Sequence, residues 1–211
     1  MRDLEIVAFL DESKKPVRDQ NTGKVAASGD HYVVAAAIVL SGDTSEIRHH
    51  LLKLVENLGH SLHYSEISKV RRPTALEGIV NISGWEGSLY ETASPVSVRQ
   101  PERRTRHRLL STALADLTRG KGATQVTLES RATPRKGYQA LDQHDHMTWR
   151  SLLDRELVSS GTTISHTDKS EPLLWIADLL AGVRTDFLCG VDRSLFSRVA
   201  HRVTSVTSVD C

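Results

Sequence analysis

The chain has 211 residues, which is enough for a single domain over residues 1–211 with its own hydrophobic core. Lys and Arg number 27 against 26 Asp and Glu, and this balance excludes a globally basic nucleic-acid coat protein. The two cysteines form no C-x-x-C pair, which excludes a disulfide framework and a zinc ribbon. The longest apolar run, YVVAAAIVL, is too short to cross a bilayer, so we expect a cytoplasmic protein without a membrane span.

The first predicted strand ends on two adjacent carboxylates. Residues 6–10, IVAFL, form a β-branched and aromatic run that is typical of a buried strand, and Asp11 and Glu12 follow it directly. We therefore expect Asp11 at the exit of this strand. The polar segment 14–30 contains Pro16 and two glycines and lacks apolar periodicity, which predicts a long hairpin loop before the second buried strand, HYVVAAAIVL.

Helical and strand patterns alternate along the rest of the chain. Apolar residues at helical spacing predict helices in DTSEIRHHLLKLVENLG, YQALDQHDHMTWRSLLDREL and EPLLWIADLLAGVRTDFL. Two further helices are predicted from Pro73 to Val80 and after Pro101, and strands in GSLYETASPVSV, ATQVTLES and TTISHT. Residues 190–211 are predicted to form a C-terminal tail. This alternation predicts a mixed α/β fold with a sheet of about five strands flanked by helices.

Three carboxylates interrupt apolar stretches that would pack better without them. Asp11 ends the first strand, and Glu129 ends the strand TQVTL. Asp178 interrupts the helix PLLWIADLLAGV on the same face as Trp175. A buried carboxylate is costly unless it is paired, so each needs a hydrogen-bond donor, an arginine or a metal. A bond to the backbone or to Arg184 would explain Asp178 alone, whereas several such acids on separate elements favour a shared site.

Four motifs resemble the family known as domain of unknown function 3800. They are FLDES, YVVAAAIVL, HYSEI and EPLLWIADLLAG, and they occur in the family's order over most of the chain. The resemblance implies an RNase H-like fold, in which three or four acids hold two divalent cations. These acids lie at the end of the first strand, at the end of the fourth strand and on a C-terminal helix. By position, Asp11, Glu129 and Asp178 take these roles, and Glu66 is the candidate for a fourth ligand.

The chemistry of such a site agrees with these residue types. Magnesium prefers oxygen ligands and retains waters, so two Mg²⁺ or Mn²⁺ ions are the predicted cofactors. Two ions ~3.5–4 Å apart would activate a water and stabilise the leaving oxygen at a phosphodiester. We predict catalytic and metal-binding roles for Asp11, Glu66, Glu129 and Asp178. His63 could orient water or move a proton. A structural histidine held by hydrogen bonds would explain the same sequence pattern.

A cationic segment from Arg99 to Arg108 contains five arginines and a single glutamate. Helical spacing directs Arg103 and Arg106 toward the interior or a cleft, and Arg104 and Arg108 toward solvent. Phosphate contacts from these five residues would be salt-sensitive and blind to sequence. A solvated basic face, or arginines that pair with the acids, explains the same pattern.

The sequence therefore predicts a metal-dependent nuclease that hydrolyses nucleic-acid phosphodiester bonds, with no base-reading element that separates RNA from DNA. One alternative is a catalytically inactive RNase H-like module that binds nucleic acid or protein through the arginine-rich helix. Another is a phosphoesterase that acts on a small nucleotide. The apolar helix over residues 172–188 and the predicted tail could also contribute to a homodimer.

Overall fold

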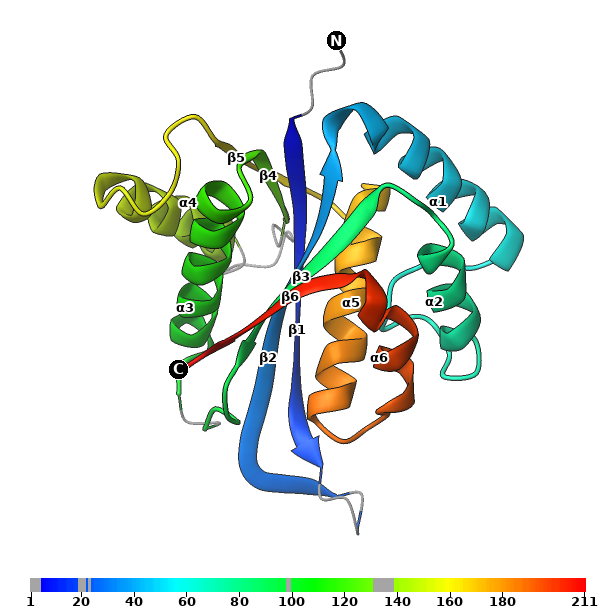
Figure 1. The fold of residues 1–211 in the computed structure, drawn as a ribbon. Coiled ribbons are helices and arrows are strands. Elements are labelled where there is room, and N and C mark those ends of the chain that lie inside the picture. The colour runs from blue at the N-terminus through cyan, green and yellow to red at the C-terminus, as the bar shows by residue number, and fades with distance from the viewer. Residues whose placement is uncertain (1–4, 19–21, 23, 98–99, 131–138) are drawn as a thin grey trace.

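The computed structural model describes residues 5–18, 22, 24–97, 100–130 and 139–211, and it shows a six-stranded mixed sheet with helices on both faces (Figure 1). The strands are, in chain order, β1 (Ile6–Arg18), β2 (Val25–Leu40), β3 (Trp85–Thr92), β4 (Ala123–Glu129), β5 (Thr163–Thr167) and β6 (Val203–Val209). Their order across the sheet is β5-β4-β1-β2-β3-β6. β2 runs antiparallel to β1 and β3, whereas β1 and β4, β4 and β5, and β3 and β6 are parallel pairs.

Helices connect these strands and cover the sheet. They are α1 (Thr44–Leu58), α2 (Arg72–Val80), α3 (Glu102–Ala115), α4 (Gln139–Asp154), α5 (Pro172–Leu188) and α6 (Ser194–Val199). Short 3₁₀ turns occupy Ser41–Asp43 and Ala200–Arg202, and a π-helical turn occupies Asp116–Gly120. Among the described residues, no helix has both the length and the apolar character that crossing a bilayer requires.

Alternate residues of the central strands face two separate hydrophobic layers. On β1, Val7 and Phe9 pack with α1, α2, α5 and α6, whereas Ala8 and Leu10 pack with α3 and α4. The two groups of helices lie on opposite sides of the sheet in Figure 1. Because both faces are buried, the central strands have nearly continuous apolar sequences instead of alternating ones.

The predicted hairpin loop over residues 14–30 is wrong, because most of this segment extends the two strands. β1 continues through Lys14 and Pro16, which pair with Tyr32 and Asp30 of β2, and β2 already begins at Val25. The extension is held by backbone pairing and carries many polar side chains, so it has no apolar periodicity by which to recognise it. Residues 19–21 and 23 lie outside the described residues.

The predicted C-terminal tail over residues 190–211 is also wrong, because it contains α6 and β6. β6 pairs with β3 at the edge of the sheet, and its side chains alternate between half-buried and exposed. Its sequence, VTSVTSV, is too polar and too short to predict burial, although its β-branched residues suit a strand. The fold class is the predicted mixed α/β class, with six strands where the sequence predicted about five.

Gly182 on α5 allows the ring of Tyr64 to pack against the helix. A Cβ atom added at Gly182 would lie 2.2 Å from the ring atom Cδ1 of Tyr64. We expect Gly182→Ala to lower the free energy of unfolding by about 1–3 kcal/mol, the typical cost of overpacking. Alanine is otherwise more favourable than glycine inside a helix. A loss of stability in Gly182→Ala would therefore identify the contact with Tyr64.

Urea denaturation measures this change, and Gly161→Ala is the matched control. The nearest atom to a Cβ at Gly161 is Ser159 Oγ at 3.8 Å, so this variant should stay within about 0.5 kcal/mol of wild type. A Gly182→Ala protein as stable as wild type would contradict the packing described here.

Candidate active site

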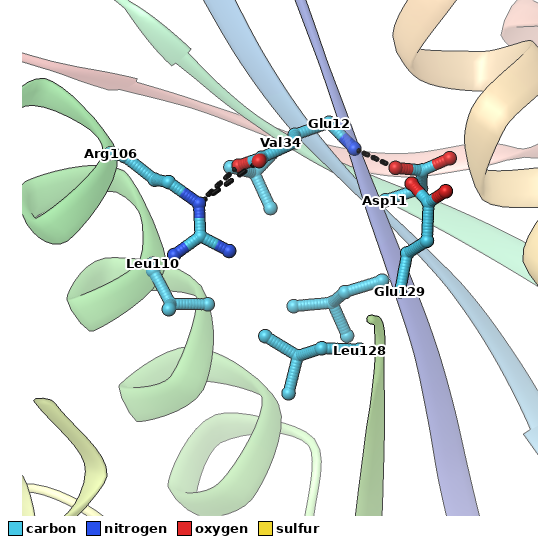
Figure 2. A pocket seen from close by; sticks show the side chains of 8 residues that line it. Asp11, Glu12, Val34, Arg106, Leu110, Leu128 and Glu129 are labelled. Carbon is cyan, nitrogen blue, oxygen red and sulfur yellow. Dashed lines mark hydrogen bonds and ion pairs between the residues drawn. The ribbon is translucent and has the colours of Figure 1, made fainter. Parts of the chain in front are cut away.

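Two carboxylates meet where β4 ends beside β1. Leu10 pairs with Leu128 in the parallel register, so Asp11 and Glu129 are the next residues on the two strands. Asp11 is therefore not at the exit of β1, as the sequence predicted, because β1 continues to Arg18 and β4 is the strand that ends. Figure 2 shows the two carboxyl groups facing each other across this junction.

A third carboxylate, Asp178, reaches the same place from α5. Its Oδ2 accepts a hydrogen bond of 3.0 Å from the backbone N–H of Tyr64, and His63 Nδ1 lies 3.5 Å from the same oxygen. The charge of Asp178 also acts on Asp11. The structure therefore places Asp11, Glu129 and Asp178 in the lining of one groove, and His63 lies beside Asp178.

The electrostatics of this cluster follow from burial and from repulsion between like charges. Burial, a hydrogen bond with Glu129 and the charges of Asp178 and Glu129 together raise the pKa of Asp11 well above its usual range. The backbone N–H of Glu12, 2.7 Å from Asp11 Oδ1, acts in the opposite direction. Two carboxyl groups can share a hydrogen bond when one holds a proton, and a cation can take the place of that proton. Carboxylate oxygens suit a hard divalent ion, although these three acids are not among the described groups whose ligand atoms all lie within 4.8 Å of one another.

An open groove passes over the cluster. Its lining contains the three carboxylates together with Ser13, Lys15, Tyr64, Arg72, Asp168 and Lys169. Lys169 Nζ lies 3.3 Å from Glu129 Oε1. The groove therefore joins acidic and cationic groups on one accessible surface, and Lys169 is a site residue that the sequence pattern did not reveal.

Glu66 is not among the carboxylates that the structure brings together. Its side chain is exposed, and one of its oxygens accepts a hydrogen bond of 2.6 Å from Ser61 Oγ. The segment HYSEI reaches the site instead through the backbone N–H of Tyr64, which binds Asp178. A metal-binding role for Glu66 has no geometric support in this arrangement.

A buried network fixes Tyr64 at the wall of the groove. Its hydroxyl donates to Asp186, which is fully buried and also binds Lys15 Nζ at 2.6 Å and Arg72 at 3.1 Å. Burial and the neighbouring Asp186 carboxylate raise the pKa of Tyr64, so its hydroxyl keeps its proton as a donor. This network holds the backbone that orients Asp178.

Arg106 contradicts the predicted nucleic-acid contact, because two buried carboxylates occupy its guanidinium. Its Nε lies 2.8 and 2.9 Å from the two oxygens of Glu12, as Figure 2 shows, and its terminal nitrogens bind both oxygens of Asp145. Glu12 points to the α3 face of the sheet because side chains alternate along β1. Arg106 thus pairs with acids, which was the alternative explanation for the arginine-rich segment.

The other arginines of that segment differ in their positions. Arg103 is exposed, contrary to its predicted inward direction, and it lies 3.2 Å from His144. Arg104 is exposed as predicted, and Arg108 donates a hydrogen bond of 2.8 Å to the carbonyl of Asp210. Arg99 lies outside the described residues. Arg103, Arg104 and Arg106 line one pocket together, whereas Arg108 lies outside it.

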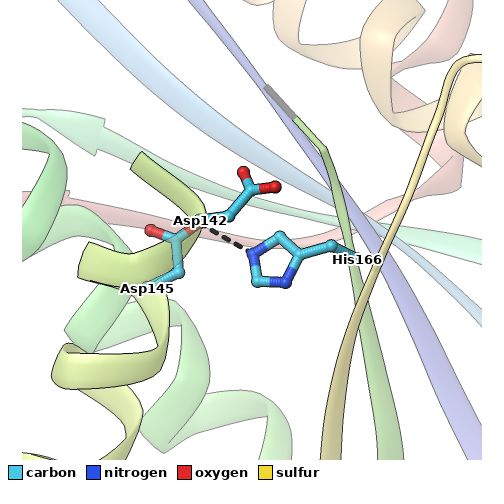
Figure 3. Close-up of side chains that lie close together, drawn as sticks. All are labelled: Asp142, Asp145 and His166. Carbon is cyan, nitrogen blue, oxygen red and sulfur yellow. Dashed lines mark hydrogen bonds and ion pairs between the residues drawn. The ribbon is translucent and has the colours of Figure 1, made fainter. Parts of the chain in front are cut away.

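A second group of potential metal ligands lies beyond Arg106. Asp142, Asp145 and His166 each offer a ligand atom, and these atoms lie within 4.8 Å of one another (Figure 3). His166 Nε2 is 3.1 Å from Asp145 Oδ2. Burial opposes ionisation of Asp145, but the hydrogen bonds from His166 and Arg106 prevail and lower its pKa. Because protein donors already occupy both oxygens of Asp145, this group is better explained as a structural network.

One solved structure resembles this chain at low sequence identity. No family model and no curated protein matches the chain. Among solved structures, the chain is similar to one in the complex of PCNA and RNase HII from Archaeoglobus fulgidus, with 18% sequence identity and a TM-score of 0.46. The match covers 86% of this chain and 73% of that one. The fold itself is a mixed sheet flanked by helices, and its assignment as RNase H-like stays a prediction from the sequence.

Arg106 should contribute strongly to stability. Arg106→Met leaves the buried Glu12 and Asp145 without their cation, so we expect a loss of about 3–5 kcal/mol in the free energy of unfolding. Arg104→Met is the control, because Arg104 is exposed and its loss should cost less than about 0.5 kcal/mol. Guanidinium denaturation compares the two variants, and equal stabilities would refute the buried network.

Asp11 should destabilise the metal-free protein as pH rises. Its folded-state pKa lies above the unfolded value near 3.8, so the folded state binds more protons between these two values. The free energy of unfolding therefore falls as pH rises through this window, and Asp11→Asn removes that fall. In a chelating buffer we expect Asp11→Asn to be more stable than wild type at pH 8, with a smaller difference at pH 4.

Thermal denaturation across this pH range measures the difference. Glu66→Gln, which removes an exposed carboxylate, should follow the wild-type profile. A pH-independent difference between Asp11→Asn and wild type would contradict the electrostatic account.

Proposed function

We propose that this protein is a metal-dependent nuclease that hydrolyses phosphodiester bonds in nucleic acid. The observation that carries the proposal is the convergence of Asp11, Glu129 and Asp178, from three separate elements, on an open groove. Close, partly buried carboxylates repel one another and are retained where a cation uses them. The resemblance to the domain of unknown function 3800 family supports the same three residues.

The groove residues have distinct parts in this proposal. Asp11, Glu129 and Asp178 would hold Mg²⁺ or Mn²⁺ through their oxygens. Two such ions would supply an activated water and stabilisation of the leaving oxygen. The Tyr64 N–H holds Asp178 in place, and His63, beside the same carboxylate, is positioned to accept or deliver a proton at the edge of the site.

Cations for the substrate backbone are present in the same groove. Lys15 and Arg72 line the groove, and both contact the buried carboxylate of Asp186. The groove, rather than the arginine-rich α3, is therefore the proposed path for the phosphates. RNA and DNA both offer this backbone.

A catalytically inactive binding module is the second candidate function. It is favoured by the ion pairs that already neutralise several acids, namely those of Arg106 with Glu12 and Asp145 and of Lys169 with Glu129. Under this alternative the groove would bind nucleic acid or protein without divalent ions. The single-domain organisation, a homodimer and a cytoplasmic location remain predictions from the sequence.

Divalent-ion binding and cleavage test the proposal together. We expect wild type to bind Mg²⁺ or Mn²⁺ by calorimetry and to cleave an RNA or a DNA oligonucleotide. Asp178→Asn preserves the size of the side chain but removes its charge, so it should abolish metal binding and reduce cleavage at least about 100-fold. Activity confined to a dinucleotide would instead indicate a small-nucleotide phosphoesterase.

Glu66→Gln is the matched control because it removes the charge of an exposed acid that lies outside the groove lining. This variant should bind metal and cleave like wild type. The inactive module becomes the better account if wild type binds no ion at millimolar concentration, or if Asp178→Asn binds like wild type.

A further inference from the structure

Lys169 places a positive charge directly on the carboxylate cluster. Its Nζ lies 3.3 Å from Glu129 Oε1, and its charge also interacts with those of Asp178 and Asp11. Partial burial opposes its ionisation, but these acids prevail and raise the pKa of Lys169. The lysine therefore acts as a counter-ion of all three proposed metal ligands.

The position of Lys169 is set by the turn that precedes α5. The backbone N–H of Ser170 donates to Asp168 Oδ1 at 2.9 Å, and Trp175 Nε1 donates to the carbonyl oxygen of Lys169 at 2.7 Å. Trp175 also packs edge-on against His63, whose Nδ1 is 3.5 Å from Asp178. Trp175 thus contacts both the backbone of Lys169 and His63, the residue beside Asp178.

A divalent ion and Lys169 compete for the same carboxylate oxygens. Glu129 is largely buried, with 10% of its side chain exposed, whereas 51% of the Lys169 side chain is exposed. When Glu129 binds a metal, the lysine is therefore the partner that can move. Its ammonium group then remains in the lining of the groove without its carboxylate partner, where a phosphate is the complementary charge.

We propose that Lys169 is a further substrate-binding residue, held by Glu129 in the metal-free protein and transferred to a backbone phosphate when divalent ions occupy the carboxylates. This inference rests on the proposed function. It assigns to one residue two opposite effects, competition with the metal and attraction of the nucleic acid.

The chain offers a matched control in Lys14. It lines the same groove, but its Nζ binds Asp30 and Glu102, each at 3.1 Å, outside the carboxylate cluster. Lys14→Met removes the same charge as Lys169→Met without freeing a proposed metal ligand. Lys169→Arg retains the charge and tests whether the charge alone is needed.

The first measurement is a calorimetric titration with Mg²⁺ at pH 8 and low salt, where ion pairs are weakly screened. We expect Lys169→Met to bind Mg²⁺ about fivefold more tightly than wild type, the order of effect of one partly exposed ion pair. Lys14→Met and Lys169→Arg should both stay close to wild type. An unchanged or weaker affinity in Lys169→Met would overturn the inference.

The second measurement is the binding of a fluorescent single-stranded 12-mer, as DNA and as RNA, at saturating Mg²⁺, with the integrity of the strand checked on a gel. We expect Lys169→Met to bind about fivefold more weakly, with the salt dependence of log K reduced by about 0.7. Lys169→Arg should retain wild-type affinity. If Lys169→Met binds the 12-mer as tightly as wild type, Lys169 is not a substrate-binding residue.

These outcomes separate the inference from the proposed function. If wild type binds Mg²⁺ and the 12-mer and Lys169→Met behaves like wild type in either titration, the inference fails and the nuclease proposal stands. If wild type binds no divalent ion, the nuclease proposal fails and the role of Lys169 fails with it.

Discussion

The parallel register of β4 against β1 is the constraint on which the proposed site depends. Pairing Leu10 with Leu128 makes carboxylates the next residues on both strands, at the point where β4 ends. Backbone hydrogen bonds hold the two strands, so Asp11 and Glu129 cannot separate as freely as acids on loops. Their proximity is therefore built into the sheet; after burial, the hydrogen bond with Glu129 and then the charges of Asp178 and Glu129 raise the pKa of Asp11.

The buried acids on the two faces of the sheet have different partners. On the α3 face, Arg106 binds Glu12 and Asp145 with most of its donors, and this network needs no further cation. On the α5 face, three acids line the groove, and the half-exposed Lys169 interacts with all three. The first arrangement stabilises the fold, whereas the second leaves negative charge that a divalent ion can use. This contrast separates a structural network from a candidate catalytic one.

The sequence identified what depends on local pattern and missed what depends on distant partners. Asp11, Glu129 and Asp178 were predictable because each interrupts an apolar stretch, and all three line the same groove. The position of Glu66 depends on the direction of a loop, which spacing does not determine. Arg106 was placed in the interior correctly, but its partner Asp145 lies on another helix and gave no local signal. The extended strands and β6 are held by backbone pairing more than by burial, so apolar periodicity could not reveal them.

The most direct test of the three-carboxylate site is the anomalous scattering of Mn²⁺ in crystals of the wild-type protein. This measurement places each ion without relying on activity, and it distinguishes the two groups of potential ligands on opposite faces of the sheet. Our account predicts manganese bound by Asp11, Glu129 and Asp178, with Lys169 turned away from Glu129. Manganese bound by Asp142, Asp145 and His166 instead, or no bound ion at millimolar concentration, would contradict it.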